Sequence, residues 1–577
     1  MAIQLDGMQM RTTIFLIALA VSCLRLATAS PQLATPEPPA AVEPNHFLHD
    51  TEHRRQAIEA DQRQRQLRRE HPLQPAPSPQ GAPADQDGPD APCWYVSGVA
   101  LAGNRLLSAE QLQQAVQPHL SPCLTPGHIN RLLAAITQRY TAAGYVASRP
   151  LLLARPEDGQ PLRLAIEEGF VEAIELAGDD LPVSLAAAFP DVLGAPLQLR
   201  QLEQGLDQLN RLRSIDLTAD IEPGELQGGS RIVLRALSRP SRWQLTGGLD
   251  NGGSATTGRN RASLNLALDN PLERNDFLTF YGSGSHISGG AGSAAAAGVY
   301  YSLPYGPWSL SVSANAFRYR TQANGRAAQL EFSGGSTLFS YSLERALWRD
   351  QHRLLSATLR LDDKSAENYL QASRLAVQSP HYQSLEAGLN GLWLGSATWA
   401  GYLGYARGLG GWTANNGRTI KQPGAQTAAY GKWRASLSRS ATYAWAELKW
   451  TLTSALQGQY SAQYMPQLEA LSLAGGNHVR GFQSAGADSG KGVAWSNTLY
   501  LPFSLRPPLR LTPSLGLDAG WADGLGKQQG DRLLGAAMGL SLDHPSGNVT
   551  AQYQRSLYRR RAPTEPAYWR LALQLRF

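Results

Sequence analysis

Apolar and polar residues alternate with a period of two along much of the chain from about residue 241 to the last residue. The alternation is clearest over residues 308–316, 355–362 and 569–577, and Gly-, Asn- and Ser-rich segments separate such runs. Strands that face lipid on one side and a wet lumen on the other have this pattern, with aromatic residues toward their ends. The pattern therefore predicts an outer-membrane β-barrel over residues 239–577. A soluble β-sandwich or propeller is the alternative, but the second face of such strands is rarely so regularly Ser, Asn and Arg.

The length of this region sets the expected number of strands. At roughly 20 residues for each strand with its loop, it holds about 16 antiparallel strands, within the even-numbered range of such barrels. No stretch after residue 30 comes near a transmembrane helix. If the chain spans a membrane, it must do so as a closed barrel, because only closure leaves no unpaired backbone in lipid.

Residues 93–238 are predicted to form two small α/β units, each in the order strand, helix, helix, strand, strand. In the first unit Ser108 is the N-cap of a short helix, whereas Thr125 and Pro126 begin a longer helix that Gly144 ends. Two tandem copies of one unit indicate a recognition arm rather than an enzyme. The expected strands are 94–102, 145–154, 161–167, 171–177, 214–221 and 230–237, and the expected helices of the second unit are 182–189 and 199–212.

Residues 45–71 have the composition of a helix without an apolar face. Acid-to-base pairs spaced i,i+4, such as Glu59 and Arg63, favour a helix, and the few apolar residues form no stripe. Such a helix has no face to dock on a hydrophobic core, so it is either free in solvent or placed in a wet, polar cavity. Seven prolines within residues 72–92 then predict a stiff, extended linker.

The N-terminus has the features of a secretory signal peptide. Arg11 precedes an apolar run over residues 14–21, and the Ala-Thr-Ala of residues 27–29 fits the cleavage rule, so residues 1–29 would be removed. A membrane anchor is the alternative for the apolar run, but a spanning helix needs roughly 20 apolar residues. A lipid anchor at Cys23 is a further alternative, although the residues before it match that signal poorly.

Two cysteines remain after this cleavage, Cys93 and Cys123. In an oxidising compartment such a pair predicts a disulfide. Closing a loop of this length would stabilise the fold by about 3–4 kcal/mol if the effect is one of chain entropy. Two free structural thiols are the alternative.

Composition excludes several classes of protein. The net charge of +6 is small for 577 residues and gives no case for nucleic-acid binding, which would need a basic patch. Three cysteines exclude a Cys-rich zinc array. The sequence has no G-x-S-x-G, H-E-x-x-H, C-x-x-C or phosphate-loop motif. We therefore predict no catalytic residue, no metal site and no cofactor.

The chain resembles the TpsB transporters of two-partner (type Vb) secretion, which export filamentous haemagglutinins, haemolysins and contact-dependent inhibition toxins. Four stretches in the family's order carry the resemblance, which covers essentially the whole mature chain. A lone VRGF would be a weak signal, whereas four ordered stretches are specific. They are Cys93 to Thr125 with INRLLAAITQRYTAAGYVASR (129–149), AFPDVLGAPLQLRQLEQGLDQLNRLRS (188–214), LDNGGSATTGRNRASLNLALDNPL (249–272) and VRGF (479–482).

The resemblance implies an architecture as well as a function. The pore would export one large β-helical exoprotein of the TpsA type, which arrives unfolded and adds a strand to a POTRA sheet edge. It would lie in the outer membrane of a Gram-negative bacterium, with its POTRA domains in the periplasm. The implied parts are an N-terminal extension with a plug helix (30–71), a linker (72–92), two POTRA domains (93–169 and 170–238) and a 16-stranded barrel (239–577).

The resemblance also implies a lumenal ion pair. In the family the VRGF loop folds back into the barrel, and its Arg pairs with an Asp of the wall, which corresponds to Asp518. The alternation supports this position, because Leu515 and Leu517 take the lipid side and Asp518 has the other parity near them. A solvated loop residue is the alternative for Arg480. The residues of the motif are Val479, Arg480, Gly481 and Phe482.

Phe577 ends an amphipathic strand, the feature that barrel-assembly machinery recognises in outer-membrane proteins generally. An ordinary last strand is the alternative. Outer-membrane lipid and this machinery are therefore expected partners besides the exoprotein. Two other functions stay open: a barrel insertase, which usually carries three or more POTRA domains and no plug helix, and a passive porin, which carries no POTRA-like arm.

Overall fold

The computed structural model describes most of the chain from residue 45 onward. The predicted signal peptide, residues 30–44 and 68–71, and all but the last two residues of the predicted linker lie outside the described residues. Within the described part, no helix is long and apolar enough to cross a membrane. The described residues are 45–67, 91–178, 181–238, 240–287, 292–324, 329–350, 352–409, 428–445, 448–463, 465–474, 478–483, 488–523 and 530–577.

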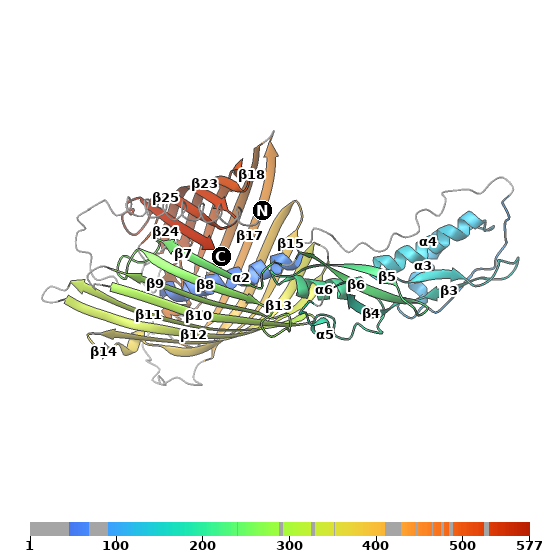
Figure 1. The fold of residues 1–577 in the computed structure, drawn as a ribbon, viewed down its shortest axis with the longest axis horizontal. Coiled ribbons are helices and arrows are strands. Elements are labelled where there is room, and N and C mark those ends of the chain that lie inside the picture. The colour runs from blue at the N-terminus through green and yellow to red at the C-terminus, as the bar shows by residue number, and fades with distance from the viewer. Residues whose placement is uncertain are drawn as a thin grey trace, which may run out of the picture.

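The barrel is the larger part of the molecule (Figure 1). It is closed and antiparallel, and the described residues supply its sixteen long strands, which confirms the prediction. The last strand pairs with the first, so no strand edge is left open to lipid. Two short strands, β14 (Ser373–Arg374) and β22 (Phe503–Arg506), pair beside them. The long strands are β7 (Trp243–Asp250), β8 (Arg261–Asp269), β9 (Phe277–His286), β10 (Gly292–Tyr305), β11 (Trp308–Asn324), β12 (Gln329–Arg349), β13 (Arg353–Leu370), β15 (His381–Leu394), β16 (Ala397–Leu409), β17 (Gly431–Trp445), β18 (Leu448–Tyr460), β21 (Gly492–Tyr500), β23 (Leu509–Ala522), β24 (Asp531–His544), β25 (Gly547–Arg559) and β26 (Tyr568–Arg576).

Strand β13 shows how the alternation divides the two faces of the wall. Leu355 and Leu359 are exposed on the outer face, whereas Ser356 and Arg360 are buried toward the lumen. The outer face is thus apolar and the inner face polar, as a lipid-embedded barrel requires. Charged residues that face the lumen can therefore pair with other wall residues or with segments that lie inside the barrel.

Two α/β units precede the barrel and extend to one side of it (Figure 1). Each has a three-stranded mixed sheet, in the order β1-β3-β2 for the first and β4-β6-β5 for the second. The first contains β1 (Val99–Ala102), α3 (Ala109–Val116), η1 (Gln117–His119), α4 (Pro126–Ala142), β2 (Arg149–Leu152) and β3 (Leu162–Glu167). The second contains β4 (Phe170–Leu176), α5 (Leu185–Ala188), α6 (Leu199–Asn210), β5 (Asp216–Pro223) and β6 (Gly229–Ser238).

The predicted capping residues begin and end the helices of the first unit. Ser108 caps α3 and Thr125 caps α4, each in a capping box, so two backbone N–H groups at the start of each helix are satisfied. Gly144 follows α4 with φ of +94°, a left-handed conformation that glycine adopts without strain. The apolar face of α4 then packs on the sheet, with Ile136 and Tyr140 fully buried.

Two predicted strands of the first unit are shorter than expected. The strand predicted from residue 94 begins at Val99, because Trp94 exchanges both backbone hydrogen bonds with Leu124 instead of joining the sheet. The strand predicted from residue 145 begins at Arg149, because the backbone N–H of Tyr145 turns back to the carbonyl of Tyr140. A bridge to the segment before α4 replaces the sheet at Trp94, and a local turn bond replaces it at Tyr145.

The second unit is docked on the barrel through buried charges. Arg349, at the end of β12, forms ion pairs with Glu203 and Asp207 of α6, and all three side chains are almost fully buried. Gln208 of the same helix donates to the carbonyl of Gly306 in the β10–β11 turn over 2.7 Å. These contacts identify the end of the barrel from which the arm projects, and they fix the arm against it.

Candidate functional site

The helix α2 (Asn45–Leu67) lies inside the barrel (Figure 1). Side chains of β9, β12, β13 and β17 reach it there. Thr51 Oγ1 is 3.4 Å from the hydroxyl of Tyr281 on β9, and the Arg54 guanidinium lies 4.9 Å from the centre of the same ring. On another part of the wall, Arg63 donates to Glu344 of β12 over 3.0 and 3.2 Å. Of the two surroundings that the sequence left open for this helix, the structure shows the polar cavity.

Glu52 joins the helix to a cluster of charges on the barrel wall. Its Oε1 accepts hydrogen bonds from Arg360 of β13 at 3.3 Å and from Arg434 of β17 at 3.1 Å. Both arginines also bind Glu386 of β15, at 3.0 Å and at 2.5 and 2.7 Å respectively. Charge-assisted bonds of this kind are strong and directional, so polar contacts take the place of an apolar docking face.

Other charges of the helix are balanced within it. Arg55 forms ion pairs with Glu52 and Glu59, each at 2.7 Å, and Arg65 pairs with Asp61 at 2.9 Å. These i,i+3 and i,i+4 pairs stabilise a helix in any surroundings. Because these pairs form within the helix, they are present whether it lies inside or outside the barrel. They therefore contribute little to the free energy that holds the helix in the lumen.

The helix also contacts the arm, where Ile58 packs beside the buried apolar cluster of the second α/β unit. Arg211, which follows α6, donates to Gln62 of α2 over 3.3 Å. The same guanidinium donates to Ser302 of β10 over 2.5 Å and to Ser309 of β11 over 3.2 Å. A single buried side chain thus touches the helix, the second α/β unit and the barrel wall.

The loop between β18 and β21 also folds into the lumen, with η3 (Gln467–Glu469), β19 (Leu471–Ser472) and β20 (Asp488–Ser489). Glu469 is buried among the wall residues Lys364, Lys432 and Tyr382, at 2.6, 2.5 and 3.0 Å. This cluster lies close to the Glu52 cluster, since Glu52, Lys364, Arg434 and Glu469 line one cavity. The lumen is therefore occupied twice, by α2 and by this loop.

The structure brings Arg480 of this loop onto Asp518 of β23. The guanidinium donates two hydrogen bonds of 2.6 Å to the two carboxylate oxygens, and the backbone N–H of Arg480 donates a third of 2.9 Å. Asp518 faces the lumen and is only 1% exposed, whereas Leu515 and Leu517 of the same strand are 54% and 52% exposed on the lipid side. A bidentate pair of this kind fixes both the position and the orientation of the loop.

Small residues on the wall make room for the rest of the motif. Val479 and Phe482 are fully buried. Gly481 has φ of +92°, and a side chain there would overlap the backbone of Arg555 on β25. A Cβ at Gly535 of β24 would overlap the carbonyl oxygen of Arg480. The loop backbone therefore lies directly against the barrel wall.

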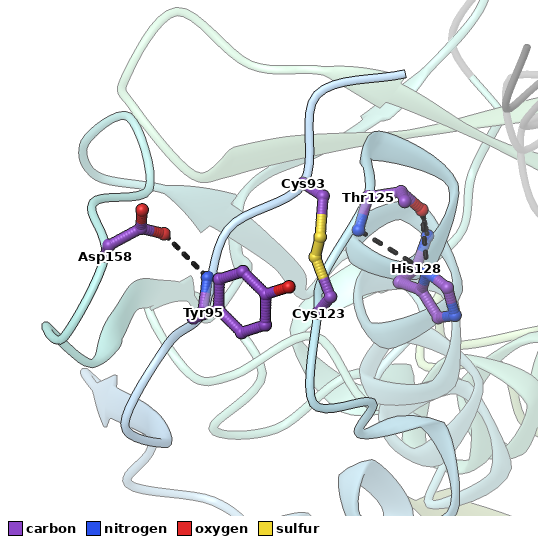
Figure 2. The surroundings of a disulfide bond; sticks show 6 residues. All are labelled: Cys93, Tyr95, Cys123, Thr125, His128 and Asp158. Atoms are coloured by element: carbon purple, nitrogen blue, oxygen red, sulfur yellow. Dashed lines mark hydrogen bonds between the residues drawn. A yellow bond between two sulfur atoms is a disulfide. The ribbon is translucent and has the colours of Figure 1, made fainter. Parts of the chain in front are cut away.

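Cys93 and Cys123 form a disulfide in the first α/β unit (Figure 2). Their Cα atoms are 5.5 Å apart, within the usual range for such a bond. The bond ties the segment before β1 to the residue that precedes the Thr125 cap of α4 by two positions. Both cysteines belong to the first α/β unit, so the bond stabilises the arm and takes no part in the lumen.

Phe577 lies at the barrel seam. Its backbone N–H donates to the carbonyl of Leu245 on β7 over 2.9 Å, and the ring is exposed on the outer surface. The terminal residue thus takes part in the pairing that closes β26 on β7.

Sequence reasoning missed the charge clusters around Glu52 and Glu469. The available signal was a set of charged residues, such as Arg360 and Arg434, at positions whose parity is that of the lumen. Nothing in the sequence shows which of them meet, because that depends on the register between strands. Among the described residues, no group of three or more His, Cys, Asp or Glu side chains is arranged to hold a metal ion.

Comparisons with protein families match most of the chain. The model of the family "Haemolysin secretion/activation protein ShlB/FhaC/HecB" matches residues 228–542. A ShlB-type POTRA model matches residues 94–169, and a further POTRA model matches residues 170–223. Similar proteins include the haemolysin transporter HpmB of Proteus mirabilis, 30% identical over 79% of this chain and 81% of its own. The outer membrane transporter CdiB of Escherichia coli is 30% identical over 94% of this chain and 92% of its own.

Solved structures show the same architecture. CdiB from Escherichia coli superimposes with a TM-score of 0.83 at 25% identity, covering 94% of this chain and 100% of that one. CdiB from Acinetobacter baumannii, at 19% identity, has the same fold with a TM-score of 0.74. Both matches extend over 94% of this chain, so they cover the barrel and the two α/β units together. The chain therefore belongs to the ShlB/FhaC/HecB family of haemolysin secretion/activation proteins, the POTRA-bearing outer-membrane transporters of two-partner secretion.

Proposed function

We propose that the protein exports one large β-helical exoprotein and that α2 is a plug which must leave the lumen before the client can pass. The observation that carries this proposal is the Glu52 contact with Arg360 and Arg434. These bonds hold the helix by charges that water or a passing chain can replace, whereas an apolar face would hold it permanently. When the helix leaves, both arginines keep Glu386, so neither is left as an unpaired charge.

The Arg480–Asp518 pair is proposed to keep the loop between β18 and β21 in place during export. Its carboxylate is buried and bound by both side chain and backbone of Arg480, so separation would leave a charge without a partner. The pair is therefore the fixed part of the lumen. The helix, whose described wall contacts are side-chain hydrogen bonds with no backbone pairing, is the part that moves.

Client recognition is assigned to the POTRA sheets, where an extended segment of the exoprotein would add a strand. The edge strand β2 is a candidate, because it has a partner only on its β3 side in that sheet. Leu151, Leu152 and the following Leu153 are exposed there. Backbone groups would supply affinity for an unfolded client, and the leucines would favour apolar side chains.

Assembly of the barrel is proposed to depend on Phe577. The ring is exposed on the outer surface at the seam between β26 and β7, where assembly machinery could reach it. Deleting this one residue should lower the amount of folded barrel in the outer membrane. A level equal to that of the intact chain would leave Phe577 as an ordinary terminal residue.

The plug is tested by single-channel conductance in planar bilayers, with the mature protein compared with a variant that lacks residues 45–67. We expect low, flickering conductance from the mature protein and large, steady conductance from the deletion variant. Equal, steady conductance from both would refute the plug and favour a passive porin. No conductance from either would show that the loop bearing Arg480 closes the pore alone, or that the protein is an insertase.

A further inference from the structure

A row of four side chains crosses the outer surface of the barrel on adjacent strands. In the backbone register, Arg353 of β13 pairs with Trp393 of β15, Trp393 with Trp399 of β16, and Trp399 with Arg439 of β17. We call these residues the Arg–Trp–Trp–Arg row. With strands about 4.8 Å apart, the row spans about 14 Å of the surface.

All four side chains belong to the lipid-facing set of their strands. Each shares its parity with an exposed leucine of the same strand, and the two tryptophans are themselves 51% and 38% exposed. An arginine at such a position is costly in the middle of a bilayer and tolerated near its surface. The four leucines are Leu355, Leu389, Leu403 and Leu437.

The row lies toward the end of the barrel that carries the POTRA arm. Arg353 begins β13 just after the turn whose Arg349 is bound to α6, and Trp393 and Trp399 flank the short β15–β16 turn. Arg439 is farther from its turn, but its guanidinium donates over 2.8 Å to the hydroxyl of Tyr443, four residues closer to that end. The charges are thus directed to the periplasmic surface of the membrane.

Both arginines are held by the tryptophans rather than by acids. The guanidinium of Arg353 lies 4.7 Å from the centre of the Trp393 ring, and that of Arg439 lies 5.5 Å from Trp399. Among the described residues, neither guanidinium forms an ion pair with a carboxylate. Stacking on an aromatic face fixes the plane of a guanidinium and leaves N–H groups at its edge available to an anion, although one N–H of Arg439 is already donated to Tyr443.

One carboxylate lies close to the row, Asp350 in the β12–β13 turn. Its Oδ1 accepts the backbone N–H groups of His352 and Arg353, both at 2.9 Å, and its Oδ2 accepts the indole N–H of Trp348 at 3.3 Å. It shapes the turn and attracts Arg353 electrostatically, but it does not take up the guanidinium.

From these observations we propose that the Arg–Trp–Trp–Arg row binds the phosphodiester headgroup of an anionic glycerophospholipid in the periplasmic leaflet. The arginines supply N–H donors to phosphate oxygens, and the tryptophans supply the amphipathic contact typical of the membrane interface. The neighbouring pair of Arg345 over Trp308, at 5.0 Å, repeats the device on β12 and β11. The site is independent of the plug and of the client.

The test is native mass spectrometry of the full mature protein in detergent, incubated with equal amounts of phosphatidylglycerol and phosphatidylethanolamine. We expect the protein to retain phosphatidylglycerol preferentially. The R353Q/R439Q variant should lose about thirtyfold in this preference and each single variant about fivefold, since each arginine near an anionic surface contributes roughly that factor. The single variants keep the test decisive if the double variant does not form a closed barrel.

The matched control is R320Q, because Arg320 is exposed on β11 near the opposite end of the barrel and is paired with Glu331. It should bind phosphatidylglycerol as the unaltered protein does, and excess inorganic phosphate should not displace the lipid. Equal retention of both lipids, an unchanged preference in R353Q/R439Q, or displacement by free phosphate would overturn the proposal. In a second incubation with equal amounts of phosphatidylglycerol and lipid A, a preference for lipid A, which occupies the other leaflet, would also overturn it.

Discussion

Replacing Glu52 by glutamine removes the negative charge through which α2 is held to two strands of the barrel wall. Arg360 and Arg434 lose a charged acceptor at 3.3 and 3.1 Å but keep Glu386. Arg55 loses the same acceptor and keeps Glu59 at 2.7 Å. The substitution therefore weakens the helix in its site without leaving a buried arginine unpaired.

The size of the effect follows from the bonds that exist only while the helix is inside. A hydrogen bond to a charged group contributes about 1.5–3 kcal/mol, and the amide oxygen of glutamine can still accept one of the two bonds. We therefore expect a loss of about 2 kcal/mol, which raises the ratio of open to plugged barrels about thirtyfold. The Glu52–Arg55 pair is present in both states and does not contribute.

The assay is the open probability of single channels in planar bilayers, compared between the unaltered protein, E52Q and the control D61N. Asp61 is on the same helix, but its partner Arg65 is also on the helix and both side chains are largely exposed. D61N should therefore leave the open probability unchanged. An unchanged open probability in E52Q, or an equal rise in D61N, would refute the idea that the wall contacts hold the plug.

Substitutions at three further places test other parts of the structure. R480A should lower the stability of the folded barrel by about 3–5 kcal/mol, because it strands the buried Asp518; R480K should restore only part of this, because lysine cannot form the bidentate pair. For both variants, the temperature at which the folded barrel loses its faster gel mobility measures stability. An unaltered melting temperature in R480A would contradict the prediction. R349A should speed hydrogen exchange in α6, which then carries two buried acids without their cation, and unchanged exchange would show that the arm docks without this pair. C93S/C123S should destabilise the first POTRA domain by about 3–4 kcal/mol, seen as faster exchange in α4; matching rates in both proteins would argue against a stabilising role.

Features with a local physical cause could be predicted from the sequence. The capping residues Ser108 and Thr125 and the left-handed Gly144 begin and end helices where expected, because the backbone groups that they satisfy are close in sequence. The lumen-facing side of Asp518 could be predicted for the same reason. Side chains alternate between the two faces of a strand, and this depends only on positions within that strand.

Features that depend on distant strands could not be predicted. Arg360, Glu386 and Arg434 lie on β13, β15 and β17, and only the barrel register brings them to the same charge as Glu52. The sequence offered polar residues of the correct parity without their partners. The start of β1 was predicted too early for the same reason. Residues from Trp94 onward have the pattern of a strand, but the backbone of Trp94 pairs with Leu124, which is distant in the chain.

The proposal that α2 must leave for the pore to open is tested most directly by tethering it. In the variant R63C/E344C a short cleavable bis-maleimide can join the helix to β12, where the native side chains meet at 3.0 Å and the native cysteines Cys93 and Cys123 are already bonded to each other. We predict that the cross-linked protein stays closed in planar bilayers and that cleaving the linker restores openings. Openings as frequent before cleavage as after it would contradict the account.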